Sequence, residues 1–175
     1  MTSREEFDDA RSFLEKRLQL ANEMPEFWDL CHRVRSVFDT SQPWSFLNEI
    51  IQNSVDAGAR NIRMDVGSNA VDIQHDGSEP LNAYAVQGLC GFALSTKGLD
   101  SVGFMGIGFK SFTGFFERVT ISDDGISALL QAPFNNKQVD LKALYSPTWV
   151  SKPLVRKSGM TTAFRFQGPK GNTIE

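Results

Sequence analysis

The chain has 175 residues, of which 41% are hydrophobic and 22% are charged, and this composition excludes a wholly disordered protein. With 18 basic and 21 acidic residues the net charge is −3, which argues against a domain that coats nucleic-acid backbone. Two cysteines, Cys31 and Cys90, are too few for a disulfide scaffold, and no apolar run is long enough to span a membrane. We therefore expect a cytoplasmic protein with a core rich in phenylalanine.

Apolar residues recur with the period of a helix in the first part of the chain. The pattern predicts three helices, over 3–23, 26–38 and 45–57. Pro25 separates the first two, a turn is expected at 39–43, and Gly58 ends the third helix. We expect an N-terminal helical extension over 1–38 and one compact domain over 39–175.

Beyond Gly58 the apolar period changes to two, which is typical of strands. The strands are expected over 62–66, 71–75, 117–122, 126–132 and 161–167, and the first two are joined by a turn at 67–69. Between them we expect a helix over 81–94, a loop over 95–105, a short helix after Gly108 and looser structure over 133–158. Early helices followed by strands with tight turns predict an α+β two-layer sandwich, in which helices cover one face of a mixed, mostly antiparallel sheet.

The segment 47–59, LNEIIQNSVDAGA, carries a polar helix face of restricted chemistry. Helical spacing puts Glu49, Asn53 and Asp56 together on the side opposite to the apolar residues. A solvated face usually includes Lys and Arg, whereas this face offers two carboxylates and an amide. Such groups suit Mg²⁺, together with a carboxylate that orients or deprotonates a water. An ordinary solvated helix face is the alternative interpretation.

The segment 102–111, VGFMGIGFKS, is a glycine-rich loop that leads into an apolar helix. Loops of this kind expose backbone N–H groups beside a positive helix end, which suits phosphate. The Walker A pattern fails because Phe109 stands directly before Lys110, and the dinucleotide pattern fails because Ser111 replaces its last glycine. Taken alone, the loop is equally compatible with a structural turn.

The strand VDIQHDG, 71–77, ends in polar residues. Alternation puts His75 on the face of Val71 and Ile73, and Asp76 on the opposite face. A single inward histidine is more often a hydrogen-bonded core residue than a ligand. A bulge of one residue would instead turn Asp76 inward, so the sequence leaves both registers open.

In this order and spacing, the three segments resemble the ATP-binding domain of the gyrase, heat-shock chaperone, histidine kinase and mismatch-repair (GHKL) superfamily, which has the Bergerat fold. Glu49-x-x-x-Asn53-x-x-Asp56-Ala57 resembles the first motif of that family, and QNSVDAGARNI resembles its mismatch-repair and sacsin branches. GFMGIGFKS resembles the phosphate loop of the heat-shock chaperone branch. The resemblance covers residues 40–167.

The resemblance implies a role for each matched residue. Glu49 would be the general base for the water that attacks the γ-phosphate, Asn53 would bind Mg²⁺, and Asp56 would support the site by hydrogen bonding. The other residues implied in nucleotide binding are His75, Asp76 and Gly77 in the adenine motif; Ser95, Thr96 and Lys97 in the lid; Gly103, Gly106, Ile107, Gly108, Phe109 and Lys110 in the phosphate loop; and Thr162 on the last strand.

The chain departs from the adenine motif of the family, D-x-G-x-G. With Gly77 at its first glycine, His75 stands at the aspartate position and Glu79 at the second glycine. Met160 takes the place of the family's threonine on the last strand, which leaves Thr162 two residues further along the same face. A carboxylate accepts a hydrogen bond from the adenine amino group, whereas a neutral imidazole does so in one tautomer only.

From the resemblance we expect the N-terminal ATPase domain of a chaperone-like or sacsin-like protein, which binds Mg-ATP and hydrolyses it slowly in isolation to ADP and phosphate. Its partners would be ATP and ADP, further domains or a partner protein and, as one option, a second copy bound in a nucleotide-dependent way. No membrane is expected, and no nucleic acid on this domain alone. The alternatives are a regulatory or interaction module with weak turnover and a DNA-transaction ATPase of the mismatch-repair kind.

Overall fold

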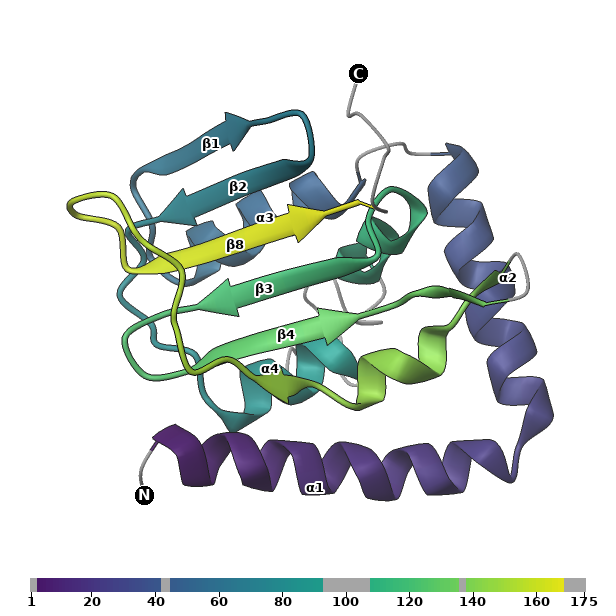
Figure 1. Ribbon diagram of the computed structural model, residues 1–175. Coiled ribbons are helices and arrows are strands. Elements are labelled where there is room, and N and C mark those ends of the chain that lie inside the picture. The colour runs from purple at the N-terminus through teal and green to yellow at the C-terminus, as the bar shows by residue number, and fades with distance from the viewer. Residues whose placement is uncertain (1–2, 42–44, 93–107, 136–137, 169–175) are drawn as a thin grey trace.

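A computed structural model describes residues 3–41, 45–92, 108–135 and 138–168. The chain forms a two-layer α+β sandwich, with helices packed behind a six-stranded antiparallel sheet (Figure 1). This is the predicted fold class. Within the described ranges, none of the helices combines the length and the hydropathy that crossing a membrane requires.

Three long helices come first in the chain, as predicted. They are α1 (Ser3–Asn22), α2 (Pro25–Ser41) and α3 (Ser45–Asp56). Pro25 is the first residue of α2, a position where the missing N–H leaves no hydrogen bond unmade. Because α2 continues to Ser41, the turn predicted at 39–43 is in large part helical.

The sheet joins two hairpins through its last strand. Its strands, in spatial order, are β1 (Ile62–Val66), β2 (Ala70–His75), β8 (Thr162–Gln167), β3 (Arg118–Ser122), β4 (Ser127–Gln131) and β7 (Thr148–Trp149). The five long strands agree with the predicted ranges within about one residue at each end. The central position of β8 puts its residues next to both β2 and β3.

The connecting segments hold the remaining elements. These are α4 (Ala83–Cys90), the 3-10 helix η1 (Gly108–Gly114), the strands β5 (Phe134–Asn135) and β6 (Gln138–Val139), and the 3-10 helix η2 (Leu141–Tyr145). The region predicted as loose, 133–158, therefore contains three two-residue strands and one helical turn. The helix predicted over 81–94 is shorter and ends at Cys90.

The core between the sheet and the helices is largely aromatic. Phe46, Phe116 and Phe166 have at most 1% of their surface exposed, and their ring centroids lie 5.1–5.6 Å apart. Helix α1 shares this core, since Phe7 is fully buried and its ring meets that of Trp149 edge to face at 5.4 Å. The N-terminal helix therefore packs mainly against α4 and η2, and it reaches the sheet at β7 through Phe7 and Trp149.

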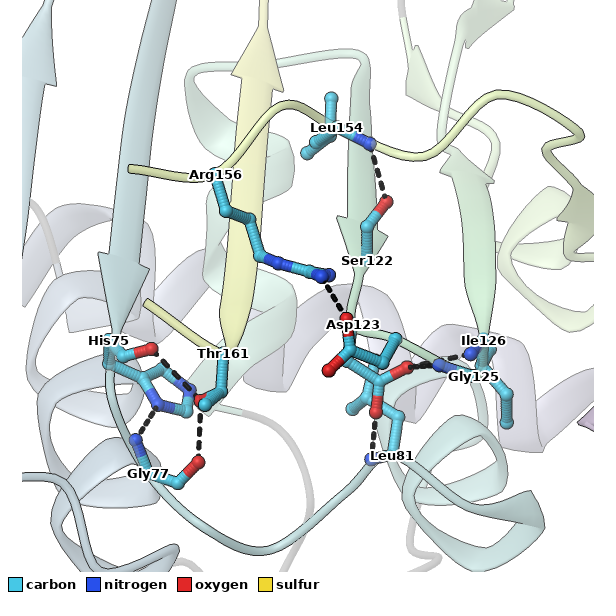
Figure 2. A network of polar contacts seen from close by, with 11 residues as sticks. His75, Gly77, Leu81, Ser122, Asp123, Gly125, Ile126, Leu154, Arg156 and Thr161 are labelled. Atoms are coloured by element: carbon cyan, nitrogen blue, oxygen red, sulfur yellow. Dashed lines mark hydrogen bonds and ion pairs between the residues drawn. The ribbon is translucent and has the colours of Figure 1, made fainter. Parts of the chain in front are cut away.

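Residues 150–160, which we call the strap, cross the outer face of the sheet on the way to β8 (Figure 2). The side-chain oxygen of Gln74 accepts a hydrogen bond from the N–H of Lys157 at 2.8 Å, and the N–H of Leu154 donates to the Ser122 hydroxyl at 3.2 Å. These bonds fix the strap to β2 and β3. The strap delivers Thr161 to the end of β2.

Candidate functional site

The end of β2 lies directly against the end of α3. A Cβ added to Gly77 would lie 2.9 Å from the carbonyl oxygen of Ala57 and 2.9 Å from Nδ1 of His75. Ser78 also donates its N–H to the carbonyl of Ala57 at 2.9 Å. Only glycine allows this close approach without displacing backbone. The predicted adenine motif therefore lies beside the helix that carries Glu49, Asn53 and Asp56.

Glu49 lies against the first residue of η1. A Cβ added to Gly108 would lie 2.3 Å from Cγ, Cδ and Oε1 of the Glu49 side chain. Gly108 is the last glycine of the predicted phosphate loop, and Glu49 is the predicted general base. The fold thus brings these two residues, which are distant in the sequence, into direct contact.

His75 belongs to the inner face of the sheet. It lies opposite Ile62 on β1 and Thr162 on β8 in an unbroken register, with 4% of its surface exposed. There is no bulge at this point, so His75 is the inward residue, as the alternation predicted. Thr162 is buried beside it on the same face.

The imidazole of His75 has a defined hydrogen-bonding state. Gly77 donates its N–H to Nδ1 of His75 at 3.1 Å (Figure 2), which leaves Nε2 to carry the proton of the neutral ring. Burial lowers the pKa of His75 below its ordinary value, and the Asp76 carboxylate offsets this only in part. His75 is therefore a hydrogen-bond donor through Nε2, and this tautomer fits a ring nitrogen of adenine better than the amino group.

The side chain of Asp76 stabilises the turn between α3 and β1. Its carboxylate accepts hydrogen bonds from the backbone N–H groups of Arg60 and Asn61 and from the Asn61 side chain, each at 2.8 Å. These bonds, led by that of the Asn61 side chain, lower the pKa of Asp76 to about 2. Of the two residues proposed for the adenine contact, Asp76 is the one engaged away from the inner face.

Thr161 is a residue that the sequence analysis missed. Its hydroxyl lies within hydrogen-bonding distance of the carbonyl oxygens of His75, at 3.1 Å, and Gly77, and its N–H donates to His75 O at 2.9 Å (Figure 2). Thr161 thereby holds the end of β2 in place. The family resemblance pointed to Thr162, and no sequence signal marked its neighbour as the residue that fixes Gly77.

Asp123 fixes the segment that follows Gly77. Its carboxylate accepts hydrogen bonds from the N–H groups of Leu81 at 2.7 Å, Gly125 at 2.8 Å and Ile126 at 2.6 Å (Figure 2). One buried carboxylate thus joins the chain beyond the adenine motif to the β3–β4 turn. This support limits how far the end of β2 can move.

Lys110 and Phe109 point into the protein interior. The ammonium group of Lys110, with 1% of the residue exposed, donates to the carbonyl of Gly88 in α4 at 2.9 Å and lies 5.5 Å from the centre of the Phe92 ring. Burial lowers the pKa of Lys110 to about 8. Phe109 packs against Phe112 at 5.4 Å in the core. Both residues stand in the predicted phosphate loop, and their side chains contribute to packing.

The remaining predicted residues divide into two groups. Asn53 is half-buried and Asp56 is exposed, both on α3 with Glu49. The others lie outside the described residues: Ser95, Thr96, Lys97, Gly103, Gly106 and Ile107. The nucleotide-binding roles of all these residues stay predictions.

The donor chemistry of α3 fits a magnesium ion held jointly with phosphate. Across 3–41, 45–92, 108–135 and 138–168, no three His, Cys, Asp or Glu side chains gather as a metal-binding cluster. Mg²⁺ usually keeps several waters and takes only one or two protein oxygens when it also binds substrate phosphates. Asn53 carries an amide oxygen of this kind, one turn of α3 after the predicted general base Glu49.

No family model matches the chain, and no curated protein matches it. Among solved structures, the chain is similar to one described as the crystal structure of the N-terminal domain of a DNA repair protein. The identity is 18% and the TM-score is 0.47, and the match covers 78% of this chain and 38% of that chain. The chain therefore spans well under half the length of that structure, and DNA repair is a role of that protein.

Proposed function

We propose that this chain is a nucleotide-binding domain that binds Mg-ATP along the polar face of α3 and hydrolyses it slowly to ADP and phosphate. The contact between Glu49 and Gly108 is the observation that carries the proposal. It puts a carboxylate against the end of a glycine-rich segment, where phosphate and an attacking water would meet. The proposed wider role, in a chaperone-like or sacsin-like protein, rests on the sequence resemblance alone.

The environment of each residue in the proposed site suits the role that we propose for it. Glu49 would orient the attacking water and accept its proton. Gly108 carries no side chain, so backbone could approach a phosphate next to that carboxylate. His75 would donate from Nε2 to a ring nitrogen of adenine, with Thr162 beside it on the inner face. Asn53 would hold Mg²⁺, which would offset the negative charge of the phosphates.

One observation favours a second candidate, a nucleotide-binding module with weak turnover. The Nδ1 atom of His75 already accepts a hydrogen bond from Gly77, so the ring has no acceptor for the adenine amino group. Weaker recognition of adenine would favour regulation or protein interaction over efficient hydrolysis. A DNA-transaction ATPase is the remaining alternative, and it predicts faster turnover when DNA is added.

The binding test is calorimetric titration of the protein with ATP, in Mg²⁺ and in EDTA, for the wild type, Asn53→Ala and Asn48→Ala. Asn48 is an exposed amide on the same helix, so it is the matched control. We expect the wild type and Asn48→Ala to bind tightly only with Mg²⁺, and Asn53→Ala to lose about 10-fold or more in affinity. Absence of binding of any adenine nucleotide to the folded wild type would overturn the proposal.

Turnover is tested with Glu49→Gln, which keeps the size of the side chain and removes its basicity. We expect ATP affinity within a few-fold of the wild type and a phosphate release rate lowered by about 100-fold or more, because a general base contributes on that scale. Retained turnover would remove Glu49 from the chemistry. Measurable binding without turnover in the wild type would move the binding-module candidate ahead.

A further inference from the structure

The strand β1 is an exposed edge of the sheet. Among the described residues no other strand pairs with its outer side (Figure 1), and all five of its residues are exposed. On the inner face it carries only apolar side chains, Ile62, Met64 and Val66, of which 38%, 52% and 62% are exposed. An exposed apolar edge of this kind is a template for pairing with another strand.

The hydrogen bonds to β2 decide which backbone groups of β1 point outward. Gly67 donates to the carbonyl of Ala70 at 2.8 Å, and the carbonyl of Asn61 accepts from Asp76 at 3.3 Å. Residues of odd number therefore bond to β2, because the pairs of an antiparallel ladder alternate. The N–H and C=O groups of the inner-face residues 62, 64 and 66 are consequently directed away from the sheet, where an added strand would find them.

We propose that β1 pairs antiparallel with β1 of a second copy of this chain, in a two-fold dimer centred on Met64. In this register Met64 lies opposite the partner subunit's Met64, and Ile62 lies opposite the partner subunit's Val66. Both pairs use the outward-directed backbone groups. Two six-stranded sheets then join into one continuous sheet across the dimer axis.

The charged residues of β1 favour a second copy of this chain as the source of the strand that pairs with it. The same register puts Arg63 opposite the partner subunit's Asp65, and the symmetry repeats this pair on the other side of the axis. These are non-hydrogen-bonded pairs, in which side chains approach most closely, and opposite charges there stabilise a sheet. Within one chain Arg63 already bonds Asp65 at 2.8 and 3.0 Å on the outer face, so the two groups are positioned to form a cluster of four charges. A self-complementary strand is what a two-fold interface requires.

This surface uses none of the residues of the proposed nucleotide site, so its test does not depend on ATP binding. Sedimentation velocity would follow the wild type from micromolar concentrations to about 500 μM, because an interface built on one short strand is small and weak. We expect the dimer fraction of the wild type to rise with concentration. A wild type that stays monomeric over this range overturns the proposal.

Charge exchange tests the register. Arg63→Asp puts two carboxylates opposite each other, and Asp65→Arg puts two guanidinium groups opposite each other, so each variant should be monomeric. A mixture of the two variants should form a heterodimer, and the double variant should dimerise like the wild type. Lys152→Asp, at an exposed position of the strap, makes the same charge change elsewhere and should leave dimerisation unchanged.

The folded state of each variant is checked by circular dichroism, and ATP binding by Arg63→Asp is compared with that of the wild type. The Arg63–Asp65 pair within one chain is exposed, so its loss should change stability little. Dimerisation of both single variants at the wild-type level, or failure of the folded single variants to associate when mixed, would overturn the proposed register.

Discussion

Lys110 is a charged side chain held in an apolar environment. Its contacts include the carbonyl of Gly88 and the ring of Phe92, and Cys90, Glu49 and Cys31 all lie close enough to influence its pKa. Holding the protonated amine there costs free energy, because burial removes the water that solvates an ammonium group, and this is the largest influence on its pKa. The folded protein therefore binds this proton less tightly than the unfolded chain does.

The sign of the resulting pH effect follows from the two pKa values. The pKa of Lys110 is about 8 in the folded protein and 10.5 ordinarily, so its burial penalty is complete below pH 8 and decreases as the pH rises toward 10.5. We expect Lys110→Met to raise the free energy of unfolding by about 1–2 kcal/mol at pH 7, with a smaller gain at pH 10. Urea denaturation at both pH values measures this, with Lys152→Met as the exposed control. A variant that is less stable than the wild type at both pH values would contradict the prediction.

At the scale of elements, the packing of α3 against η1 is what brings Glu49 to Gly108. A methyl group at position 108 would collide with the end of the Glu49 side chain, which is flexible and can rotate away. A methyl group at position 108 would therefore displace the Glu49 carboxylate more than it would destabilise the fold. A small displacement of a catalytic group can lower the reaction rate considerably.

Gly108→Ala tests this dependence. We expect a folded protein with a slightly lower melting temperature and an ATP turnover reduced by about 100-fold, because the carboxylate is displaced from the water it would orient. Phosphate release and thermal unfolding measure the two effects. Gly67→Ala is the matched control, since a Cβ there would only touch the carbonyl of Ala70 at 3.5 Å. Equal turnover of the two variants would show that the position of Glu49 does not matter.

At the scale of the whole molecule, α1 shares one core with the sheet. Phe7, Ala10 and Leu14 are fully buried, and the guanidinium group of Arg4 lies 5.1 Å from the centre of the Trp149 ring. A helix packed in this way should unfold together with the rest of the chain. Its removal would expose apolar surface of α4 and of the region around Trp149.

Phe7→Ala tests this cooperativity. We expect the free energy of unfolding to fall by about 3–5 kcal/mol, in one transition, because a large cavity opens in the shared core. Phe13→Ala, on the more exposed side of the same helix, should cost less than about 1 kcal/mol. Two separate transitions in the wild type, or equal losses for the two variants, would show that α1 is an independent unit.

Regular elements of sufficient length were predictable from the sequence, since their side chains alternate or recur with a fixed period. The inward position of His75 follows from three alternating residues on β2, and the structure confirms it. The two-residue strands β5, β6 and β7 were not predictable, because two residues have no period. Residue types and spacing also led to the prediction of Glu49 and Gly108 as site residues, which stays a prediction, but they carried no information on the contact between the two.

The positions of side chains that depend on contacts with distant parts of the chain were also not predictable. Local periodicity carries no information about such contacts. A short helix was predicted after Gly108, but the segment is a 3-10 helix, which has three residues per turn and therefore different faces. The direction of Lys110 depends on the carbonyl of Gly88 in another helix. Thr161 matters because the strap brings it to Gly77, and no local pattern predicts a contact across that separation.

The central place of β8 has a consequence for how the protein is made. During synthesis the β1–β2 and β3–β4 hairpins leave the ribosome first, but they share no strand pairing until β8 arrives between them. Phe7, near the start of the chain, likewise cannot make its contact with Trp149 until residue 149 has been synthesised. The two hairpins therefore stay unjoined until the residues of β8 have been made. Such late, long-range closure slows folding and prolongs exposure to aggregation.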